Sequence, residues 1–377
     1  ERHESIGLLQ QCKHLTVWRK DDSAGLGAVN AQVAQAQLRR LDTAFKRFFK
    51  GIAAYPRFKA FGEQVSLTYP QATGNEIGKR SGKIHFSRIG YIPFTQHRPE
   101  PESGVLKTIT VKQDAANWYA VLTYEVPDSP KPVGDIRAPV GIDLGLSSLV
   151  ALDNGETVAH PRFLKAGTKR LRRAQRAVSR GKKGSRNRLK AKNRLARLHA
   201  KVARQRSDFL HKLSDGLVKR FDFLAMEDLD AGDLLENKDG LTPRRRSAER
   251  GLHRGIGDAG WGQLRSFVAY KAARAGKFFV VVPARGTTQE CSSCGATPLV
   301  RLTLRDRIHS CPCGKVMDRD TNAARNILKR GLAALSTLGH RGIQASGEQN
   351  LHRPPSRGRR VRSMKEEPLP LKVLCDN

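Results

Sequence analysis

The sequence predicts an α/β fold, preceded along the chain by a helical region and a small β domain. Three apolar runs are typical of buried strands, and segments with helical periodicity separate them. These runs are residues 140–152, 221–227 and 278–283. Because strands and helices alternate in this way, we expect one sheet covered by helices over residues 136–284.

Residues 1–54 form the predicted helical region. Within 31–50 the apolar side chains recur every three to four residues and basic side chains occupy the other faces, which predicts an amphipathic helix with a basic outer surface. The apolar positions are Leu38, Leu41, Phe45, Phe48 and Phe49. An ordinary solvated helix of a bundle would show the same pattern.

Residues 55–135 predict a small β domain. Short runs of β-branched and aromatic residues, such as 107–111 and 118–124, alternate with Gly and Pro. We expect a barrel-like arrangement in which aromatic side chains lie among basic ones. The prolines within 126–139 indicate a linker into the next domain.

A lone carboxylate, Asp143, lies inside the first predicted strand of the α/β domain. Apolar and β-branched residues surround it, and Asn154-Gly155 marks a tight turn further on, so 140–152 predicts a hairpin. A carboxylate on a buried strand is costly unless its charge is compensated, and a metal ion is the usual compensation. The alternative is an Asp whose hydrogen bonds are satisfied at a strand end or turn. A second carboxylate, Glu227, ends the strand at 221–227.

Residues 165–206 predict a basic helical hairpin. From Lys169 to Arg206 there are 17 Lys and Arg and no Asp or Glu, with a sparse apolar stripe and a glycine-containing break at 181–185. A block of like charge is often only solvated or disordered. Here the helical periodicity, and the position between two strands of one domain, favour a hairpin that faces phosphates.

The remaining segments complete the domain. Residues 228–260 are polar and glycine-rich and include Arg244-Arg245-Arg246, so we expect a flexible loop. Residues 261–275 predict a helix, and 318–330 predict a short final helix. The stretch 331–377 is rich in Pro and Arg and predicts a disordered tail.

The charge balance indicates a polyanionic partner. Lys and Arg number 69 against 35 Asp and Glu, which gives the 377-residue chain a formal net charge of +34. Nucleic acid is the first candidate for such a partner. We expect no membrane partner, because no apolar run reaches the roughly 18 residues that a membrane span needs. Since the chain begins Glu1-Arg2-His3 rather than with Met, we expect that a native N-terminal segment is missing.

Four of the six cysteines fall within 23 residues and form two pairs, Cys291 with Cys294 and Cys311 with Cys313. Paired thiolates separated by a loop suit a closed tetrahedral zinc site, so 285–317 predicts a zinc ribbon in a reduced compartment. Because His309 lies two residues before Cys311, three sulfurs and one imidazole are an alternative ligand set. A redox or accidental cluster is the other alternative.

A further acidic pair, Asp318 and Asp320, follows the ribbon at the start of the last predicted helix. Such a residue can simply cap the helix. It can also face the strands and join Asp143 and Glu227 as a metal ligand. Two-metal phosphodiester hydrolysis requires three carboxylates of this kind, and they suit Mg²⁺ or Mn²⁺.

Together these motifs resemble the transposon-encoded TnpB (OrfB) proteins of bacterial insertion sequences, relatives of the type V CRISPR effectors. The cysteine pairs followed by D-R-D-x-N-A-A-x-N-I are the most specific feature, and the N-terminal part is the least specific. The matching stretches span about residues 30 to 330, and they are Tyr55-Pro56-Arg57-Phe58-Lys59, Gly141-Ile142-Asp143-Leu144-Gly145, Ala225-Met226-Glu227-Asp228-Leu229, Cys291-Ser292-Ser293-Cys294-Gly295 and residues 318–327.

The resemblance implies an RNase H-type, RuvC-like nuclease domain over 136–284 and 318–330, with the zinc ribbon inserted before its last helix. It implies a helical recognition region over 1–54 and a β-barrel wedge domain over 55–135. By motif, Asp143, Glu227 and Asp320 match the catalytic carboxylates. Asp320 is preferred to Asp318 because it stands two residues before Asn322. Two departures from the family pattern are the C-x-C pair and the missing segment that normally begins the wedge barrel.

The family's activity is RNA-guided cleavage of DNA beside a short motif, with a guide RNA made from the transposon end. We therefore expect a metal-dependent DNA endonuclease with structural Zn²⁺ and catalytic Mg²⁺ or Mn²⁺, in the bacterial cytoplasm at the nucleoid. One alternative is a transposase that performs strand transfer itself with the same site. The other is a nuclease-silent, RNA-guided repressor, which would have lost a carboxylate, whereas all three are present.

Overall fold

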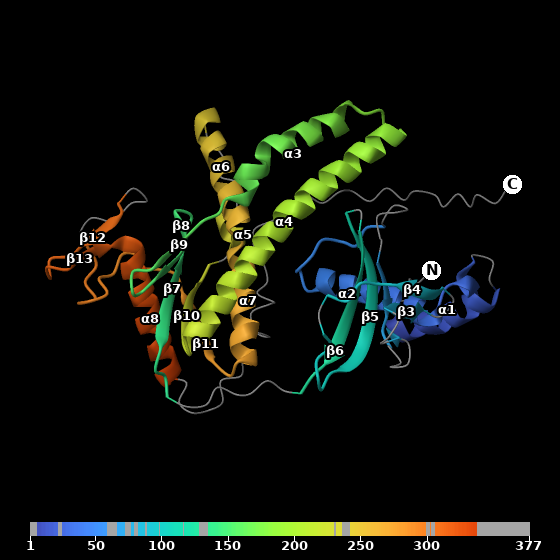
Figure 1. Ribbon diagram of the computed structural model, residues 1–377, viewed down its shortest axis with the longest axis horizontal. Helices are drawn as coiled ribbons and strands as arrows, with labels where there is room; N and C mark the ends of the chain where they lie inside the picture. The colour runs from blue at the N-terminus through green and yellow to red at the C-terminus, as the bar shows by residue number, and fades with distance from the viewer. Residues whose placement is uncertain are drawn as a thin grey trace.

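The computed structural model describes residues 6–21, 25–58, 66–71, 77–78, 82–86, 89–97, 99–115, 117–127, 135–229, 231–235, 242–298, 302 and 306–337. In Figure 1 the N-terminal elements form one body at the right, and a larger sheet with its covering helices forms the rest. The predicted tail beyond residue 337 lies outside the described residues.

Two helices open the smaller body. α1 (Leu8–Asp21) and α2 (Ala31–Phe49) are separated by a short 3-10 turn, η1 (Leu26–Ala28). The amphipathic helix predicted over 31–50 is confirmed as α2. It begins after Asn30, whose side chain accepts a hydrogen bond from the backbone N–H of Gln32. Its buried residue Val33 packs into the core of the sheets that follow.

Two three-stranded antiparallel sheets complete this body, in the orders β1-β5-β6 and β2-β3-β4. Their core contains Tyr69, Ile84, Phe86 and Ile109. Within the described residues the two sheets are not joined into one closed barrel, so the barrel is not confirmed. The strands are β1 (Ser66–Tyr69), β2 (Ile77–Gly78), β3 (Lys83–Phe86), β4 (Gly90–Pro93), β5 (Val105–Asp114) and β6 (Asn117–Glu125).

A five-stranded sheet in the order β11-β10-β7-β8-β9 is the centre of the larger body. β7, β8 and β9 pair antiparallel, whereas β10 lies parallel to both β7 and β11. The predicted hairpin and both later strands are confirmed. The parallel pairing places the carboxyl ends of β7 and β10 at the same edge of the sheet. The strands are β7 (Pro139–Leu144), β8 (Ser148–Leu152), β9 (Thr157–Ala159), β10 (Phe223–Asp228) and β11 (Phe278–Pro283).

Helices cover both faces of this sheet. α4 (Arg186–Arg220) and α7 (Trp261–Arg274) enclose the larger apolar core with β7, β8 and β10. α8 (Arg319–Thr337) packs on the opposite face, where Ile327 contacts Phe223 and Val282. Its close approach requires glycine at 141, because a Cβ there would lie 2.0 Å from the carbonyl oxygen of Ala324.

The loop predicted over 228–260 is wrong for much of its length. α5 (Ala231–Leu234) and α6 (Pro243–Ala259) are helices. Thr242 caps α6 by accepting a hydrogen bond from the backbone N–H of Arg245, and Pro243 fits the first turn. Glycines inside a helix lower its propensity, but the buried Ile256 and Ala259 anchor α6 on the core.

The predicted start of the tail at residue 331 is also wrong, because α8 continues to Thr337. Gly331 does not end the helix; it lets α8 approach β10. A Cβ at 331 would lie 2.6 Å from the Cβ of Ala225. Leu332 and Leu335 then pack against the same core.

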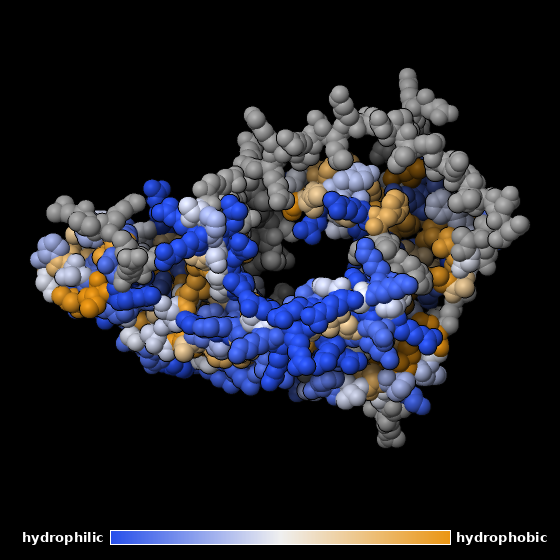
Figure 2. Space-filling model, turned by 90° about the horizontal axis from the view of Figure 1, so that it is seen from above, coloured by the Kyte–Doolittle hydropathy of each residue, from blue (hydrophilic) through white to orange (hydrophobic). Residues whose placement is uncertain are grey.

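The basic helical hairpin is confirmed as α3 (Phe163–Arg180) and α4, joined by a turn at 181–185. Leu171, Ala174 and Val178 are the buried residues of α3. Figure 2, seen from above, shows a continuous hydrophilic band over the helices that lie uppermost in Figure 1, beside a hollow in the surface. In the part of the chain that the structure describes, every helix is too short or too polar to cross a membrane.

Candidate active site and metal centre

Asp143 and Glu227 are neighbours on adjacent parallel strands. The register pairs Met226 of β10 with Ile142 of β7, so the next residue on each strand is one of the two carboxylates. Both side chains are buried, with 6% of Asp143 and 5% of Glu227 exposed. Glu227 Oε1 accepts a hydrogen bond of 3.1 Å from the backbone N–H of Leu144, which fixes it against β7.

The first turn of α8 brings Asp320 to the same place, with 19% of its side chain exposed. Asp318 has a different role. Its Oδ1 accepts hydrogen bonds from the backbone N–H groups of Asp320 at 2.9 Å and Thr321 at 3.0 Å, so it caps α8. The capping interpretation therefore applies to Asp318, and Asp320 is the residue that faces the strands.

The three carboxylates act on one another electrostatically. Burial, and next the charge of Asp320, raise the pKa of Asp143 from 3.8 to about 7. Burial, and next the charge of Asp143, raise the pKa of Glu227 from 4.5 to about 8, although the N–H of Leu144 opposes the shift. Asp143 and Glu227 therefore resist ionisation, and a divalent cation between them would stabilise their charged forms.

Two arginines, which the sequence reasoning did not single out, approach this cluster. Arg307 lies 4.0 Å from Asp320 Oδ2 through Nη1 and donates a hydrogen bond of 2.7 Å to Ser147 Oγ through Nη2. Arg319 is buried, and its Nε lies 3.6 Å from Asp320 Oδ1. The motif spacing indicates only that Arg319 separates two aspartates; its burial beside them comes from the packing of α8.

The sulfurs of Cys291, Cys294, Cys311 and Cys313 form a compact group that could hold a metal ion such as zinc. Their ligand atoms all lie within 4.8 Å of one another. The Cys291–Cys313 sulfurs are 3.8 Å apart and the Cys294–Cys311 sulfurs 3.5 Å. A tetrahedral zinc site with bonds of about 2.3 Å needs sulfur separations of roughly 3.8 Å. Both separations lie close to that value, so the four cysteines could hold a metal ion such as zinc.

The polypeptide around Cys291 favours the thiolate form that a metal ion binds. Burial acts to raise the pKa of Cys291, but the backbone N–H groups of Cys294 and Ser293 donate to its sulfur, and the pKa falls to about 5. His309, the alternative ligand, is buried on β12 (Ile308–Ser310) beside Cys291, and its side chain helps to lower the pKa of that thiol, although the compact group itself consists of the four sulfurs. β12 pairs with β13 (Val316–Asp318), and β13 carries the chain from the second cysteine pair into α8.

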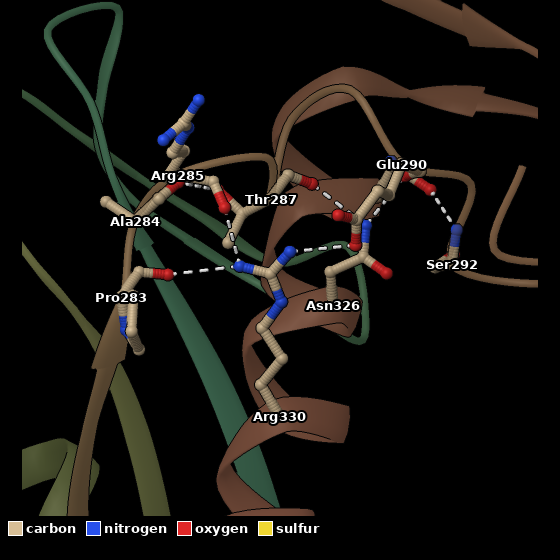
Figure 3. A network of polar contacts seen from close by, with 9 residues as sticks. Pro283, Ala284, Arg285, Thr287, Glu290, Ser292, Asn326 and Arg330 are labelled. Atoms are coloured by element: carbon tan, nitrogen blue, oxygen red, sulfur yellow. Dashed lines mark hydrogen bonds and ion pairs between the residues drawn. The ribbon is translucent and has the colours of Figure 1, made fainter. Parts of the chain in front are cut away.

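A polar network ties the start of the ribbon segment to α8 (Figure 3). Asn326 Nδ2 donates to the carbonyl oxygens of Thr287 at 2.8 Å and Glu290 at 2.7 Å. Asn322 donates to the same Glu290 oxygen and accepts from the N–H of Ser292. One turn on, Arg330 forms an ion pair of 2.8 Å with the Glu290 carboxylate. The two asparagines of the motif therefore hold the ribbon segment on the helix that carries Asp320.

The carboxylates are spread more widely than the sulfurs. Among the described residues, the cysteines are the one group of three or more such side chains with ligand atoms all within 4.8 Å. Asp143, Glu227 and Asp320 nevertheless offer hard oxygen donors, which suit Mg²⁺ or Mn²⁺, and Asp320 is open to solvent on one side.

Comparisons with known proteins place this arrangement in a family. A Streptomyces pristinaespiralis protein, named as a candidate RNA-guided DNA endonuclease, is 38% identical over 333 residues, which cover 87% of this chain and 79% of that protein. The candidate RNA-guided DNA endonuclease InsQ of Escherichia coli K12 is 32% identical and covers 85% of this chain and 78% of its own length. The chain belongs to the TnpB (OrfB) family.

Two family models cover the site of this TnpB protein. The OrfB_IS605 model, described as a probable transposase, matches residues 121–238, which include Asp143 and Glu227. The Cas12f1-like TNB domain model matches 261–327, which include the four cysteines and Asp320. A solved complex of Cas12f1 with a guide RNA and target DNA aligns with 85% of this chain and 81% of its own, at 15% identity and a TM-score of 0.48.

Proposed function

We propose that this TnpB protein is an RNA-guided, metal-dependent DNA endonuclease that cleaves target DNA beside a short motif. The observation that carries the proposal is the convergence of three carboxylates from separate elements, two on strands and one on a helix. Burying three like charges together costs stability, so the arrangement favours a site that binds cations. The names of the two relatives support nucleic acid as the substrate.

The chain's own residues divide the chemical work. Asp143, Glu227 and Asp320 hold Mg²⁺ or Mn²⁺, which when bound supply an activated water and stabilise the leaving oxygen. Arg307, half-exposed beside Asp320, contacts the phosphate that is cut, because its guanidinium offers several donors to an anion. We propose that the five-stranded sheet and the helices that cover it form an RNase H-type, RuvC-like domain.

The four cysteines hold structural Zn²⁺, and this zinc ribbon supports the active site indirectly. β12 and β13 connect the ribbon to α8, and the backbone N–H of Arg319 donates a hydrogen bond of 2.8 Å to the carbonyl oxygen of Arg307. Loss of zinc would therefore release both Arg307 and the start of α8. Zinc contributes to activity through position and takes no part in the reaction.

Nucleic acid binds along the basic hairpin α3–α4. The hydrophilic surface in Figure 2 includes these helices, whose many Lys and Arg side chains suit phosphates rather than base edges, so affinity there is independent of sequence. A guide RNA from the transposon end supplies most of the specificity by base pairing to the target DNA. We place the protein with these partners in the bacterial cytoplasm, at the nucleoid.

The experiment has two stages. RNA that co-purifies with the protein is sequenced, and the protein is then reconstituted with that RNA, matching plasmid DNA and Mg²⁺. We expect double-strand breaks that need the guide and Mg²⁺ and that disappear in Asp143→Ala, Glu227→Ala and Asp320→Ala. Asp318→Ala is the matched control within the motif, and it should lower stability but keep cleavage.

The products decide between the proposal and its rivals. Joined DNA ends in place of free breaks would indicate a transposase that performs strand transfer. Guide-dependent binding without any strand break would indicate a repressor. Full cleavage by Asp320→Ala together with an inactive Asp318→Ala protein would show that the third ligand is misassigned.

A further inference from the structure

α6 is a strongly basic helix beside the hairpin α3–α4. Against two acidic residues, Glu249 and Asp258, it carries five arginines, all of them exposed. Three of these arginines recur at intervals of four residues and therefore form a row along one face of the helix. They are Arg246, Arg250 and Arg254. Such a row offers positive charge to a polyanion over successive turns.

The arginine row keeps donors for a ligand. Arg250 Nε donates a hydrogen bond of 3.3 Å to the carbonyl oxygen of Arg246, and Arg254 Nε donates one of 3.0 Å to that of Arg250. Because a guanidinium has several N–H donors, each side chain is held along the helix and still has donors for a phosphate. α6 is one of the helices that lie uppermost in Figure 1, where Figure 2 shows the continuous hydrophilic band.

Asp258, near the end of α6, is a buried carboxylate that joins α6 to both helices of the hairpin. Only 5% of it is exposed. Its Oδ2 accepts a hydrogen bond of 2.9 Å from the backbone N–H of Leu164 in the first turn of α3, and its Oδ1 lies 3.7 Å from Arg206 Nη1 on α4. The same nitrogen of Arg206 donates a hydrogen bond of 2.9 Å to the carbonyl oxygen of Gly257. One polar junction therefore fixes three helices.

The start of α3 depends on this junction. Arg162, which precedes α3, makes no side-chain capping hydrogen bond and has a left-handed backbone with φ of 52°. α4 and α6 are capped from their own sequence, by Ser185 and Thr242. α3 instead receives its acceptor from Asp258 of another helix. Loss of this carboxylate would release the start of α3 and the end of α6 together.

The end of α6 lies beside the loop that follows Asp143. A Cβ at Gly255 would lie 3.7 Å from Leu146 Cδ2, and Leu146 stands three residues after Asp143. The next residue of this loop, Ser147, accepts the hydrogen bond from Arg307 of the ribbon segment. The loop thus has α6 and Arg307 as neighbours. A DNA strand whose phosphate reaches the three carboxylates is therefore close to the end of the arginine row.

We propose that α6 binds the DNA strand that is cut, through phosphate contacts of the arginine row. Asp258 is a positioning residue that holds this row in line with the hairpin and the three carboxylates. Because the contacts are to phosphates, they raise affinity for every DNA sequence. The inference rests on the proposed function, in that the strand is taken to be cut at the three carboxylates.

The positioning role of Asp258 has a distinctive sign. Removing a negative charge from a protein ordinarily strengthens its binding to a polyanion. Asp258→Ala should instead weaken DNA binding at least twofold, because the arginine row is no longer fixed. Asp258→Asn also removes the charge but keeps an acceptor oxygen for the N–H of Leu164, so it should retain the DNA affinity of the wild type.

Two combined variants test the arginine row. The first changes all three arginines of the row to glutamine, which keeps the helix and removes three charges. The matched control removes three charges from exposed side chains on the C-terminal half of α4 and the end of α7. Its changes are Lys212→Gln, Lys219→Gln and Arg274→Gln.

The assay uses protein loaded with the RNA that co-purifies with it. Its Kd for a fluorescently labelled single DNA strand, not complementary to that RNA, is measured by anisotropy without Mg²⁺ at several salt concentrations. We expect the α6 variant to raise this Kd about fivefold, and the slope of log affinity against log salt concentration to fall by roughly 2, since each lost contact on a single strand contributes about 0.7. RNA affinity, and the kcat for target DNA at saturation with Mg²⁺, should stay at the values of the control variant.

The inference is overturned if the α6 variant binds the DNA strand as tightly as the control variant does. Weaker RNA binding with unchanged DNA binding would overturn it too, since α6 would then contact the guide. A folded Asp258→Ala protein with unchanged or stronger DNA binding would exclude the positioning role. Asp258→Ser, whose shorter side chain withdraws the acceptor from Leu164 but stays polar, replaces an alanine variant that folds poorly. A wild-type protein that cleaves no DNA would refute the proposed function, whereas the DNA titration, which needs no cleavage, still decides the role of α6.

Discussion

Asp143→Asn should stabilise the metal-free protein, and by an amount that grows with pH. The side chain is 6% exposed, and burial with the nearby charge of Asp320 raises its pKa from 3.8 to about 7. The folded state therefore binds the proton more tightly than the unfolded state. For such a group, stability is greatest below the unfolded pKa and is lost as pH rises through the folded pKa.

The magnitude follows from these two pKa values. At about pH 5.5 ionisation of the unfolded chain costs the native state roughly 2 kcal/mol, and at about pH 8 the cost approaches roughly 4 kcal/mol. Asparagine cannot ionise, so the advantage of Asp143→Asn over the wild type should increase by about 2 kcal/mol across this interval. In a body of this size that corresponds to roughly 4–8 °C in Tm.

The assay is thermal unfolding of zinc-loaded protein at both pH values, without other divalent cations and again with Mg²⁺. Asp208→Asn on the exposed surface of α4 is the matched control, because Asp208 pairs only with Lys212 at i+4. Mg²⁺ should stabilise the wild type most at the higher pH and should affect Asp143→Asn far less. An advantage of Asp143→Asn that is the same at both pH values would refute the electrostatic reasoning.

Three further predictions test other parts of the molecule. Asn326→Ala removes two hydrogen bonds to the carbonyls of Thr287 and Glu290 and should cost about 2–3 kcal/mol, with faster amide exchange confined to the ribbon segment. Metal analysis should find about one zinc per chain in the wild type. Cys291→Ser should lose this zinc, and an unchanged zinc content would exclude the four-sulfur site. Charge reversal on the basic hairpin should weaken RNA binding for every sequence, and the slope of log affinity against log salt concentration should fall by about 0.7–0.9 per lost contact. The measurement is a set of RNA titrations at several salt concentrations. If the surface is merely solvated, wild type and variant should give the same line without offset. The residues to reverse are Arg173, Lys183, Arg186 and Arg194.

The sheet and the long helices could be predicted from the sequence because their patterns depend on local spacing. The continuous apolar runs at 140–152 and 278–283 indicate buried strands, and the apolar stripe through 165–206 recurs at the helical period of 3.6. The prediction of a flexible loop over 228–260 was wrong at α6, because the three glycines inside α6 suggested a break in the helix. Its cap and its buried anchors outweigh that propensity, which is a tertiary effect.

The candidate site was likewise predictable from the sequence only where it depends on local spacing. The cysteine spacing predicts a metal group directly, since a local motif contains all four ligands. The convergence of Asp143 with Asp320 depends instead on α8 reaching β7, which glycine at 141 allows. The residues around Asp320 do not indicate that α8 approaches β7, so the resemblance to the TnpB family was needed to choose between Asp318 and Asp320. The capping hydrogen bonds of Asp318 now give a physical reason for the choice.

The motif on α8 contains structural and site-forming residues in alternation. Asp318 caps the helix, Asp320 faces the strands, and Asn322 and Asn326 hold the ribbon segment. Because these side chains lie on one rigid element, a shift of α8 would move the carboxylate and the ribbon together. The ribbon in turn carries Arg307, which reaches back to Ser147 beyond β7. The four-sulfur group and the carboxylate cluster are thus coupled through α8 and through Arg307, and a change at one should alter the geometry of the other.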